Sequence, residues 1–215
     1  MLRSKYMFTK ESFTVDGYTI DFAIDYPKGF DGSGSYPVLF YFHGIGGIYQ
    51  GVEHVAEFCP ARRERMTDDM PFIIVAPACM DYTWMGHFSQ VIDLIKDIIA
   101  RPYVDEKRIY LSGSSMGGYT CFMLALHVPE LFAAAAICCG GGIYAIASNI
   151  KFPVRAYHGL QDPVVLHRES EMMVNAINSA GGNAELITYD YCDHDAWTPT
   201  FTNHETYRWL LSHTK

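Results

Sequence analysis

Residues 113–118 read Gly113-Ser114-Ser115-Met116-Gly117-Gly118, and this short stretch decides the predicted fold. The mostly apolar residues 108–111 before it predict a buried strand, and residues 119–127 after it predict a helix. A strand, a Gly-x-Ser-x-Gly turn and a helix together lift a serine hydroxyl above the edge of a sheet. We therefore expect Ser115 at a sharp turn, beside the free N–H groups of a helix N-terminus. The alternative is an ordinary Gly/Ser loop.

Strands and helices alternate on both sides of this stretch. Residues 13–15 and 18–26 flank Asp16-Gly17 and predict an antiparallel hairpin. Apolar runs predict buried strands over residues 36–42, 72–76, 131–139, 154–158 and 186–189. Helical patterns cover residues 51–60, 90–100, 170–180 and 205–211. The prediction is an α/β fold with a mostly parallel central sheet, helices on both faces and an antiparallel hairpin at the N-terminus.

Two further polar residues follow strands of the same predicted sheet. Asp162 comes after the strand that ends at His158, and His194 comes after the last strand. The carboxyl ends of parallel strands meet at one edge, where ligands bind. A serine nucleophile needs a base, and the base needs an orienting carboxylate, in the chain order Ser, Asp, His for this topology. We expect Ser115, Asp162 and His194 to form such a triad.

Other interpretations of these residues stay open. Asp162 could simply cap a turn before Pro163. Three rival carboxylates lie on the loop of the presumed base, where their geometry to its ring is poor: Asp190, Asp193 and Asp195. Residues 192–195, Cys-Asp-His-Asp, could also be part of a metal site, but no second ligand group has metal spacing. The expected chemistry therefore needs no metal and no cofactor.

The loop after the strand at residues 36–42 reads His-Gly-Ile-Gly-Gly over residues 43–47. Together with the N–H group of Met116, an N–H group from this loop should stabilise an oxyanion, and Ile45 is the expected donor. We expect His43 to hold the loop by a hydrogen bond rather than to act as a base, and the same holds for His158. The indoles of Trp84 and Trp197 are candidates for the wall of a substrate pocket, with core packing as the alternative.

Composition limits the setting. The net charge of −8 argues against nucleic acid and anionic membranes as partners. Six cysteines contain no CxxC pair, and residues 1–10 show no secretory signal, so we expect a cytoplasmic protein. A secreted origin with the signal removed stays open, as does the oligomeric state, a homodimer included. We found no linker or repeat, and we expect residues 1–215 to form one domain.

With these motifs the chain resembles the α/β-hydrolase superfamily. It looks most like the small single-domain esterases related to prolyl oligopeptidase catalytic domains, feruloyl esterases and dienelactone hydrolases. The resemblance runs from about Tyr36 to Leu211 and is most specific over residues 104–118, 158–162 and 194–197. Dienelactone hydrolases usually have a cysteine nucleophile, and Ser115 departs from that branch.

The resemblance implies a serine esterase that works through an acyl-enzyme. The alternatives are a small serine peptidase and a hydrolase fold recruited for ligand binding without catalysis. Many relatives carry a helical cap, but only residues 140–153 lie between the two strands that would flank it here. We expect no cap domain and a shallow, open cleft with aromatic walls, to which Tyr144 could also contribute. Such a cleft suits a small-molecule or carbohydrate ester with a short or aromatic acyl group.

Overall fold

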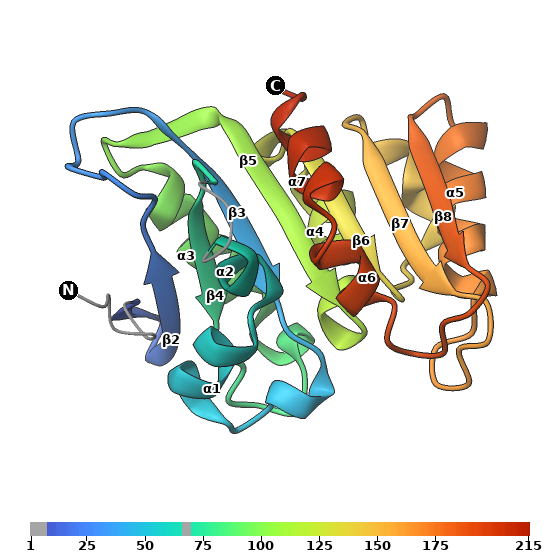
Figure 1. The fold of residues 1–215 in the computed structure, drawn as a ribbon, viewed down its shortest axis with the longest axis horizontal. Helices are drawn as coiled ribbons and strands as arrows, with labels where there is room; N and C mark the ends of the chain where they lie inside the picture. Colours follow the sequence, from blue (N-terminus) through green and yellow to red (C-terminus); the bar gives the residue numbers. More distant parts are fainter. Residues whose placement is uncertain (1–7, 66–69) are drawn as a thin grey trace.

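One sheet organises the computed structural model, which describes residues 8–65 and 70–215. Within those residues eight strands hydrogen-bond in the order β1-β2-β4-β3-β5-β6-β7-β8 (Figure 1). Their bounds are β1 Thr9–Val15, β2 Tyr18–Asp25, β3 Tyr36–Phe42, β4 Ile73–Pro77, β5 Val104–Ser114, β6 Ala134–Cys138, β7 Val154–Gly159 and β8 Ala184–Tyr189. From β4 to β8 every neighbouring pair is parallel, whereas β2 is antiparallel to β1 and to β4. The predicted mostly parallel sheet with an N-terminal hairpin is confirmed.

The hairpin has a local cause. Asp16 and Gly17 both adopt positive φ angles, 51° and 75°, as the tight turns that fit strand twist require. The pairing register Val15↔Tyr18 and Phe13↔Ile20 follows directly from that two-residue loop. At the other side of β2, Phe22 pairs with Pro77 and so joins the hairpin to the parallel part of the sheet.

Helices cover both faces of the sheet, as predicted. Residues of α3 Phe88–Ile99, α4 Met116–His127 and α5 Arg168–Ser179 pack in one core cluster with Phe40 and Ile137 of the strands. Residues of α1 Gly51–Phe58, α2 Pro60–Arg65, α6 Trp197–Phe201 and α7 His204–Leu211 pack in a second cluster with Leu39 and Tyr41. Successive strand residues thus face opposite layers, which is why the β3 sequence is a continuous apolar run. Figure 1 shows the two helical layers on either side of the strands.

Some element bounds differ from the sequence predictions. The helix predicted over residues 51–60 is two helices, because Pro60 has no N–H to donate and begins α2 instead of continuing α1. The strand predicted over residues 131–139 is shorter, since a 3₁₀ turn at Pro129–Leu131 precedes β6. The short helix α6 was not predicted from the sequence.

The connection from β6 to β7 bears on access to the sheet edge. Residues 140–153, all of which the structure describes, contain only the 3₁₀ segment Tyr144–Asn149. The expected absence of a cap domain is confirmed for the described chain. Within the same residues, no helix combines the length and apolarity that crossing a bilayer requires.

Candidate active site

The turn from β5 to α4 is sharply strained at one residue. Ser115 has φ 57° and ψ −121°, a conformation that costs a non-glycine residue about 1–3 kcal/mol. Glycines make the turn sterically allowed. A Cβ atom on Gly117 would collide with the carbonyl group of Phe42, and one on Gly113 would lie 2.7 Å from the carbonyl oxygen of Gly117. The turn therefore presents the Ser115 hydroxyl at the carboxyl edge of the sheet, as expected from the sequence pattern.

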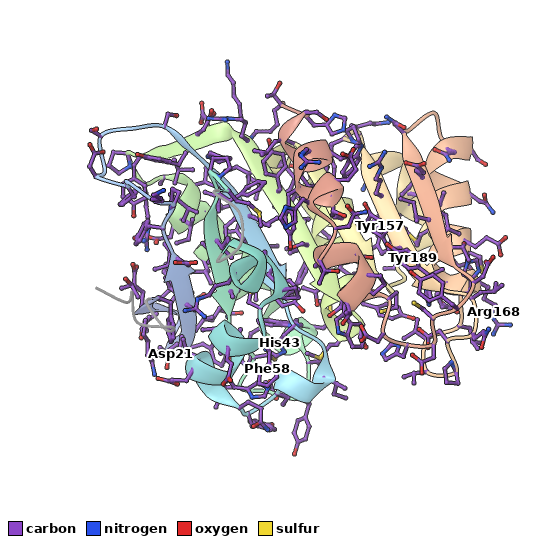
Figure 2. All side chains as sticks on the ribbon, in the orientation of Figure 1. Asp21, His43, Phe58, Tyr157, Arg168 and Tyr189 are labelled. Atoms are coloured by element: carbon purple, nitrogen blue, oxygen red, sulfur yellow. The ribbon has the colours of Figure 1, made fainter. Side chains whose placement is uncertain are left out.

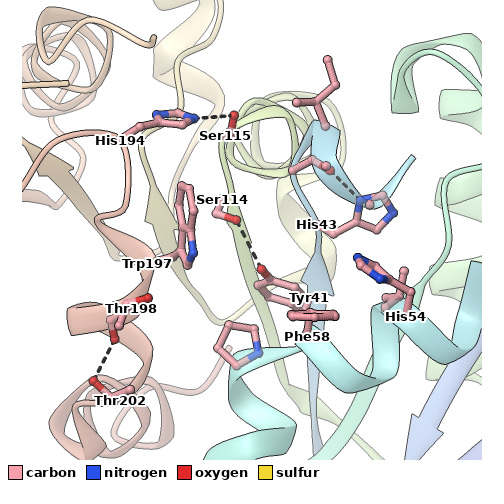
Figure 3. Close-up of a pocket in the computed structure, with 16 residues that line it drawn as sticks. Tyr41, His43, His54, Phe58, Ser114, Ser115, His194, Trp197, Thr198 and Thr202 are labelled. Atoms are coloured by element: carbon pink, nitrogen blue, oxygen red, sulfur yellow. Dashed lines mark hydrogen bonds between the residues drawn. The ribbon is translucent and has the colours of Figure 1, made fainter. Parts of the chain in front are cut away.

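Three side chains form a continuous row of hydrogen bonds. His194 Nε2 lies 3.0 Å from Ser115 Oγ, and His194 Nδ1 lies 2.7 Å from Asp162 Oδ2. Figure 3 shows the contact between His194 and Ser115 at the mouth of a pocket. A carboxylate only accepts, so Nδ1 carries the ring proton and Nε2 is free to accept the Ser115 hydroxyl hydrogen. The structure thus brings together the three residues chosen from chain order.

The carboxylate of Asp162 is buried and well supported. Its Oδ1 accepts N–H groups of Val164 at 2.8 Å and Val165 at 2.9 Å. Burial alone would raise the pKa of Asp162. The hydrogen bonds from His194 and from the two backbone N–H groups outweigh this effect and hold that pKa below its usual value. Asp162 therefore remains a carboxylate at neutral pH.

The rival carboxylates serve the loop instead. Asp195 accepts the backbone N–H and the hydroxyl hydrogen of Thr198, at 2.9 and 2.8 Å, at the start of α6. Asp193 accepts the N–H of Asp195 at 3.2 Å. Both side chains are exposed, as is Asp190. Their geometry supports the choice of Asp162 as the partner of His194.

The two candidate oxyanion donors each begin a helical segment. Met116 is the first residue of α4, and Ile45 is the first residue of the 3₁₀ segment Ile45–Gly47. The first N–H groups of a helix have no partner within it and can bind an anion. The loop approaches the nucleophile closely, because a Cβ atom on Gly44 would lie 3.3 Å from Ser115 Cβ. This arrangement is compatible with the expected roles of Ile45 and Met116.

His43 ties this loop to the segment that follows β4. Its Nε2 accepts the N–H of Cys79 at 3.0 Å, so Nδ1 carries the proton and donates to the Gly44 carbonyl oxygen at 2.7 Å. Burial lowers the pKa of His43 and keeps its ring neutral. Figure 2 shows His43 near Phe58 at the edge of the sheet where β3 ends. His43 holds the loop, as expected.

Trp84 does not line the cleft, and the expectation that it would is wrong. The indole is 3% exposed, packs edge-on against Phe42 with ring centroids 5.2 Å apart, and donates its N–H to the His43 carbonyl oxygen at 3.3 Å. Trp84 therefore supports the oxyanion loop from the core. Tyr144, the other aromatic residue considered for the wall, is exposed and does not line this cleft. Sequence position could not distinguish a buried indole from a lining one.

A cleft of about 540 Å³ opens at Ser115 and His194. The Trp197 indole lines it, as expected, and stands edge-on to the His194 ring with centroids 5.3 Å apart. Figure 3 shows Trp197 and Phe58 on different sides of this space. The sequence pattern did not predict further lining residues, which come from β3, α1, α2, α6 and the position just after α6: Tyr41, His54, Phe58, Pro60, Thr198 and Thr202. The proximity of α1 to the oxyanion loop in the chain was the available signal.

One group of three side chains in the described residues could hold a metal ion. Ligand atoms of Cys139, Asp162 and His194 lie within 4.8 Å of one another. Asp162 and His194 are members of the triad, and both His194 nitrogens already make its hydrogen bonds, so a metal there would displace one of them. Burial also raises the pKa of the Cys139 thiol to about 12, which disfavours the thiolate that binds metals.

Comparisons with known proteins agree with this geometry. The model of the prolyl oligopeptidase family matches residues 83–141, which include the Ser115 turn. A bifunctional acetylxylan esterase/xylanase of Neocallimastix patriciarum is 28% identical over 162 residues, covering 60% of this chain and 23% of that protein. A probable feruloyl esterase C of Aspergillus terreus is 25% identical over 150 residues, covering 67% of this chain and 56% of that protein. The chain thus spans from about a quarter to just over half of these relatives.

A solved structure extends the likeness over nearly the whole chain. The crystal structure of a thermostable esterase superposes with a TM-score of 0.85 at 26% identity, covering 97% of this chain and 63% of the esterase chain. The shared sheet, the strained serine turn and the absence of a cap in the described residues agree with that likeness. On these grounds, the chain belongs to the α/β-hydrolase superfamily.

Proposed function

We propose that this chain is a serine hydrolase that cleaves carboxylic esters through an acyl-enzyme. The observation that carries the proposal is the row of hydrogen bonds from Ser115 to His194 to Asp162, at 3.0 and 2.7 Å, at a strained turn. The esterase names of the similar proteins support the same reaction class.

Each step of the proposed ester hydrolysis can be assigned to a residue of the site. Ser115 Oγ attacks the ester carbonyl carbon while His194 Nε2 takes the hydroxyl proton. The N–H groups of Ile45 and Met116 stabilise the oxyanion, each lowering the barrier by about 3 kcal/mol. The carbon–oxygen bond to the alcohol then breaks, and His194 returns the proton to the leaving oxygen. Water, activated by the same ring, hydrolyses the acyl-enzyme and releases the acid. Asp162 stays ionised and holds the His194 tautomer throughout.

The cleft supports a particular class of ester. Phe58, Pro60 and Trp197 provide flat apolar walls, and the Tyr41 and Ser114 hydroxyls, 3.2 Å apart, lie inside it (Figure 3). Flat walls with a few polar groups suit an aromatic or short acyl group. Because the mouth is open, the alcohol side can be as bulky as a sugar. The substrate proposed is therefore an acetyl or hydroxycinnamoyl ester of a carbohydrate.

A small serine peptidase is the second candidate, since the matching family model is that of the prolyl oligopeptidases. An assay of acetyl and hydroxycinnamoyl esters beside peptide amides of the same acyl groups separates the two. The ester proposal predicts that kcat/KM on esters exceeds that on amides by several orders of magnitude. A preference for the amides would favour the peptidase.

A fluorophosphonate probe tests whether the site is catalytic at all. An activated serine reacts with the probe, whereas an ordinary serine does not. We expect stoichiometric labelling on Ser115 and none in the Ser115→Ala variant. An unlabelled, folded wild-type chain would instead favour a fold recruited for ligand binding.

A further inference from the structure

Asp162 contacts a second histidine besides His194. His158 Nε2 lies 3.2 Å from Asp162 Oδ2, the same oxygen that His194 Nδ1 approaches at 2.7 Å. The side chains of His158 and Asp162 are both 0% exposed, whereas that of His194 is 21% exposed. Buried polar groups are costly unless they are hydrogen-bonded, so the contact needs an explanation.

The partners of the His158 ring identify which nitrogen carries a proton. Nε2 faces the Val165 carbonyl oxygen at 2.9 Å and the Asp162 carboxylate, and neither of these groups can donate. Nε2 therefore carries a hydrogen and donates it. Nδ1 lies 2.7 Å from Ser170 Oγ, which can donate to it, and burial lowers the pKa of His158, which favours this neutral ring.

We propose that His158 is a positioning residue for the ester hydrolysis proposed above, on which this inference rests: its Nε2–H fixes Oδ2 of Asp162 for His194. This contact, for which Nε2–H is shared with the Val165 carbonyl oxygen, has two consequences. It restricts the carboxylate that orients the base, and it takes up part of the negative charge on Oδ2. Asp162 therefore attracts the proton of His194 less strongly than it would if His194 were the one hydrogen-bond donor to Oδ2.

Ser170 is the next residue in the same network. Ser170 lies in the first turn of α5, and its one hydroxyl hydrogen has two acceptors within reach: the Gly140 carbonyl oxygen after β6 at 2.9 Å and His158 Nδ1 at 2.7 Å. When its hydroxyl hydrogen points to the ring, Ser170 holds the Nε2–H tautomer. Without the hydroxyl, Nδ1 loses its hydrogen-bond partner, and the ring that presents Nε2–H to Asp162 is held less firmly.

Other ionisable groups surround this network and must be allowed for. The His167 ring, just before α5, lies with its centroid 5.5 Å from that of His158. Cys139 after β6 and Tyr119 of α4 are further titratable side chains that interact electrostatically with Asp162. These residues are unchanged in every variant described below, so differences between variants report on the His158 contact itself.

A matched pair of variants tests the proposal. His158→Gln places an amide N–H near the position of Nε2 and preserves donation to Asp162. His158→Asn is shorter, so it can still contact Ser170 but cannot donate to Asp162. For His158→Asn we expect kcat on an aryl acetate to fall about 10–100-fold, the effect of a small misplacement of catalytic groups. KM should change by less than about 3-fold. The acid limb of its pH–rate profile should move to higher pH. His158→Gln should keep kcat within about 5-fold of wild type.

Three results would overturn the inference. The first is a His158→Asn protein with the kcat and pH profile of wild type. The second is an equal loss in both variants with a lower Tm and an unmoved pH profile, which is what a packing role predicts. If His158→Asn does not fold, the Ser170→Ala variant takes its place as the test. For Ser170→Ala we expect kcat to fall about 3–10-fold, with the same shift of the acid limb of the pH–rate profile. The third overturning result is a Ser170→Ala protein in which neither kcat nor the pH–rate profile changes.

The wild-type chain separates this inference from the function beneath it. Ester turnover by wild type together with an unaffected His158→Asn variant would remove the inference alone. A folded wild-type chain that neither turns over esters nor reacts with the fluorophosphonate would remove the proposed function, and the positioning role with it.

Discussion

At the scale of single residues, the site depends on positions where no side chain is tolerated. Gly117 sits against the carbonyl group of Phe42, at the point where β3 and α4 cross. Ser115 keeps its strained φ of 57° because the close packing around it restricts the backbone of the turn to this conformation. A small change in this turn should therefore affect both stability and catalysis.

Gly117→Ala should destabilise the fold by about 1–3 kcal/mol, because the added methyl group meets backbone that cannot move away cheaply. Gly46→Ala is the matched control, since a Cβ atom there has nothing within 4 Å. Urea unfolding of both variants checks the prediction. Equal midpoints for the two variants would show that the turn has more room than the structure indicates.

The acidic side of the stability profile should depend on Asp162. Its pKa is lower in the folded state than in the unfolded state, where it is about 3.9. Ionised Asp162 thus stabilises the fold above that pH, and the contribution is lost as the pH falls through the folded-state pKa. Between pH 5 and about 3, Tm should fall less in Asp162→Asn than in wild type. Asp193→Asn removes an exposed carboxylate of the same loop and serves as control. Parallel curves for wild type and Asp162→Asn would contradict the linkage.

At the scale of elements, the cleft is built by segments that the sequence pattern described incompletely. Local features predicted the hairpin and the serine turn, since Asp16-Gly17 and Gly113–Gly118 determine their own backbone. The five-residue α6 and the break before Pro60 depend on packing against distant strands, and periodicity in so short a segment is weak. Trp84 shows the same limit, because its burial depends on Phe42 and His43 far away in the chain.

Phe58, at the end of α1, should contribute to acyl selection. Its side chain is 53% exposed and lines the cleft, so Phe58→Ala should cost little stability. We expect kcat/KM on a hydroxycinnamoyl ester to fall about 5–30-fold and that on an acetyl ester to fall much less. Tyr144→Ala, exposed but outside the cleft, is the control. Equal losses on both esters would show that Phe58 does not contact the acyl group.

At the scale of the whole molecule, the absence of a cap in the described residues determines how much of a substrate can be buried. The fold and the row of three polar residues could be predicted because the strand order places the loops that carry Ser115, Asp162 and His194 at one edge of the sheet. The width of the cleft could not be predicted from the sequence, because it depends on how α1 and α6 pack across that edge. A buried methylene contributes about 0.8 kcal/mol, and an exposed one almost nothing.

Lengthening the acyl chain of the substrate should therefore lower kcat/KM and not raise it. We expect kcat/KM to be highest on acetyl to butyryl or hydroxycinnamoyl esters and to fall beyond chains of about eight carbons. No rate increase should accompany micelle formation by the substrate. A series of p-nitrophenyl esters measured below and above the micelle threshold checks both points. A preference for long chains, or a jump at the threshold, would require a cover over Ser115.

The most direct test of the central claim is the turnover of an aryl acetate by Ser115→Ala, His194→Ala and Asp162→Asn, measured beside wild type on folded protein. Ser115→Ala and His194→Ala should each lower kcat by several orders of magnitude and to a similar extent, because the two residues act as one unit. Asp162→Asn should lower it about 10²–10⁴-fold, through the wrong tautomer of the base. Near-wild-type turnover by a folded Ser115→Ala variant would contradict the account.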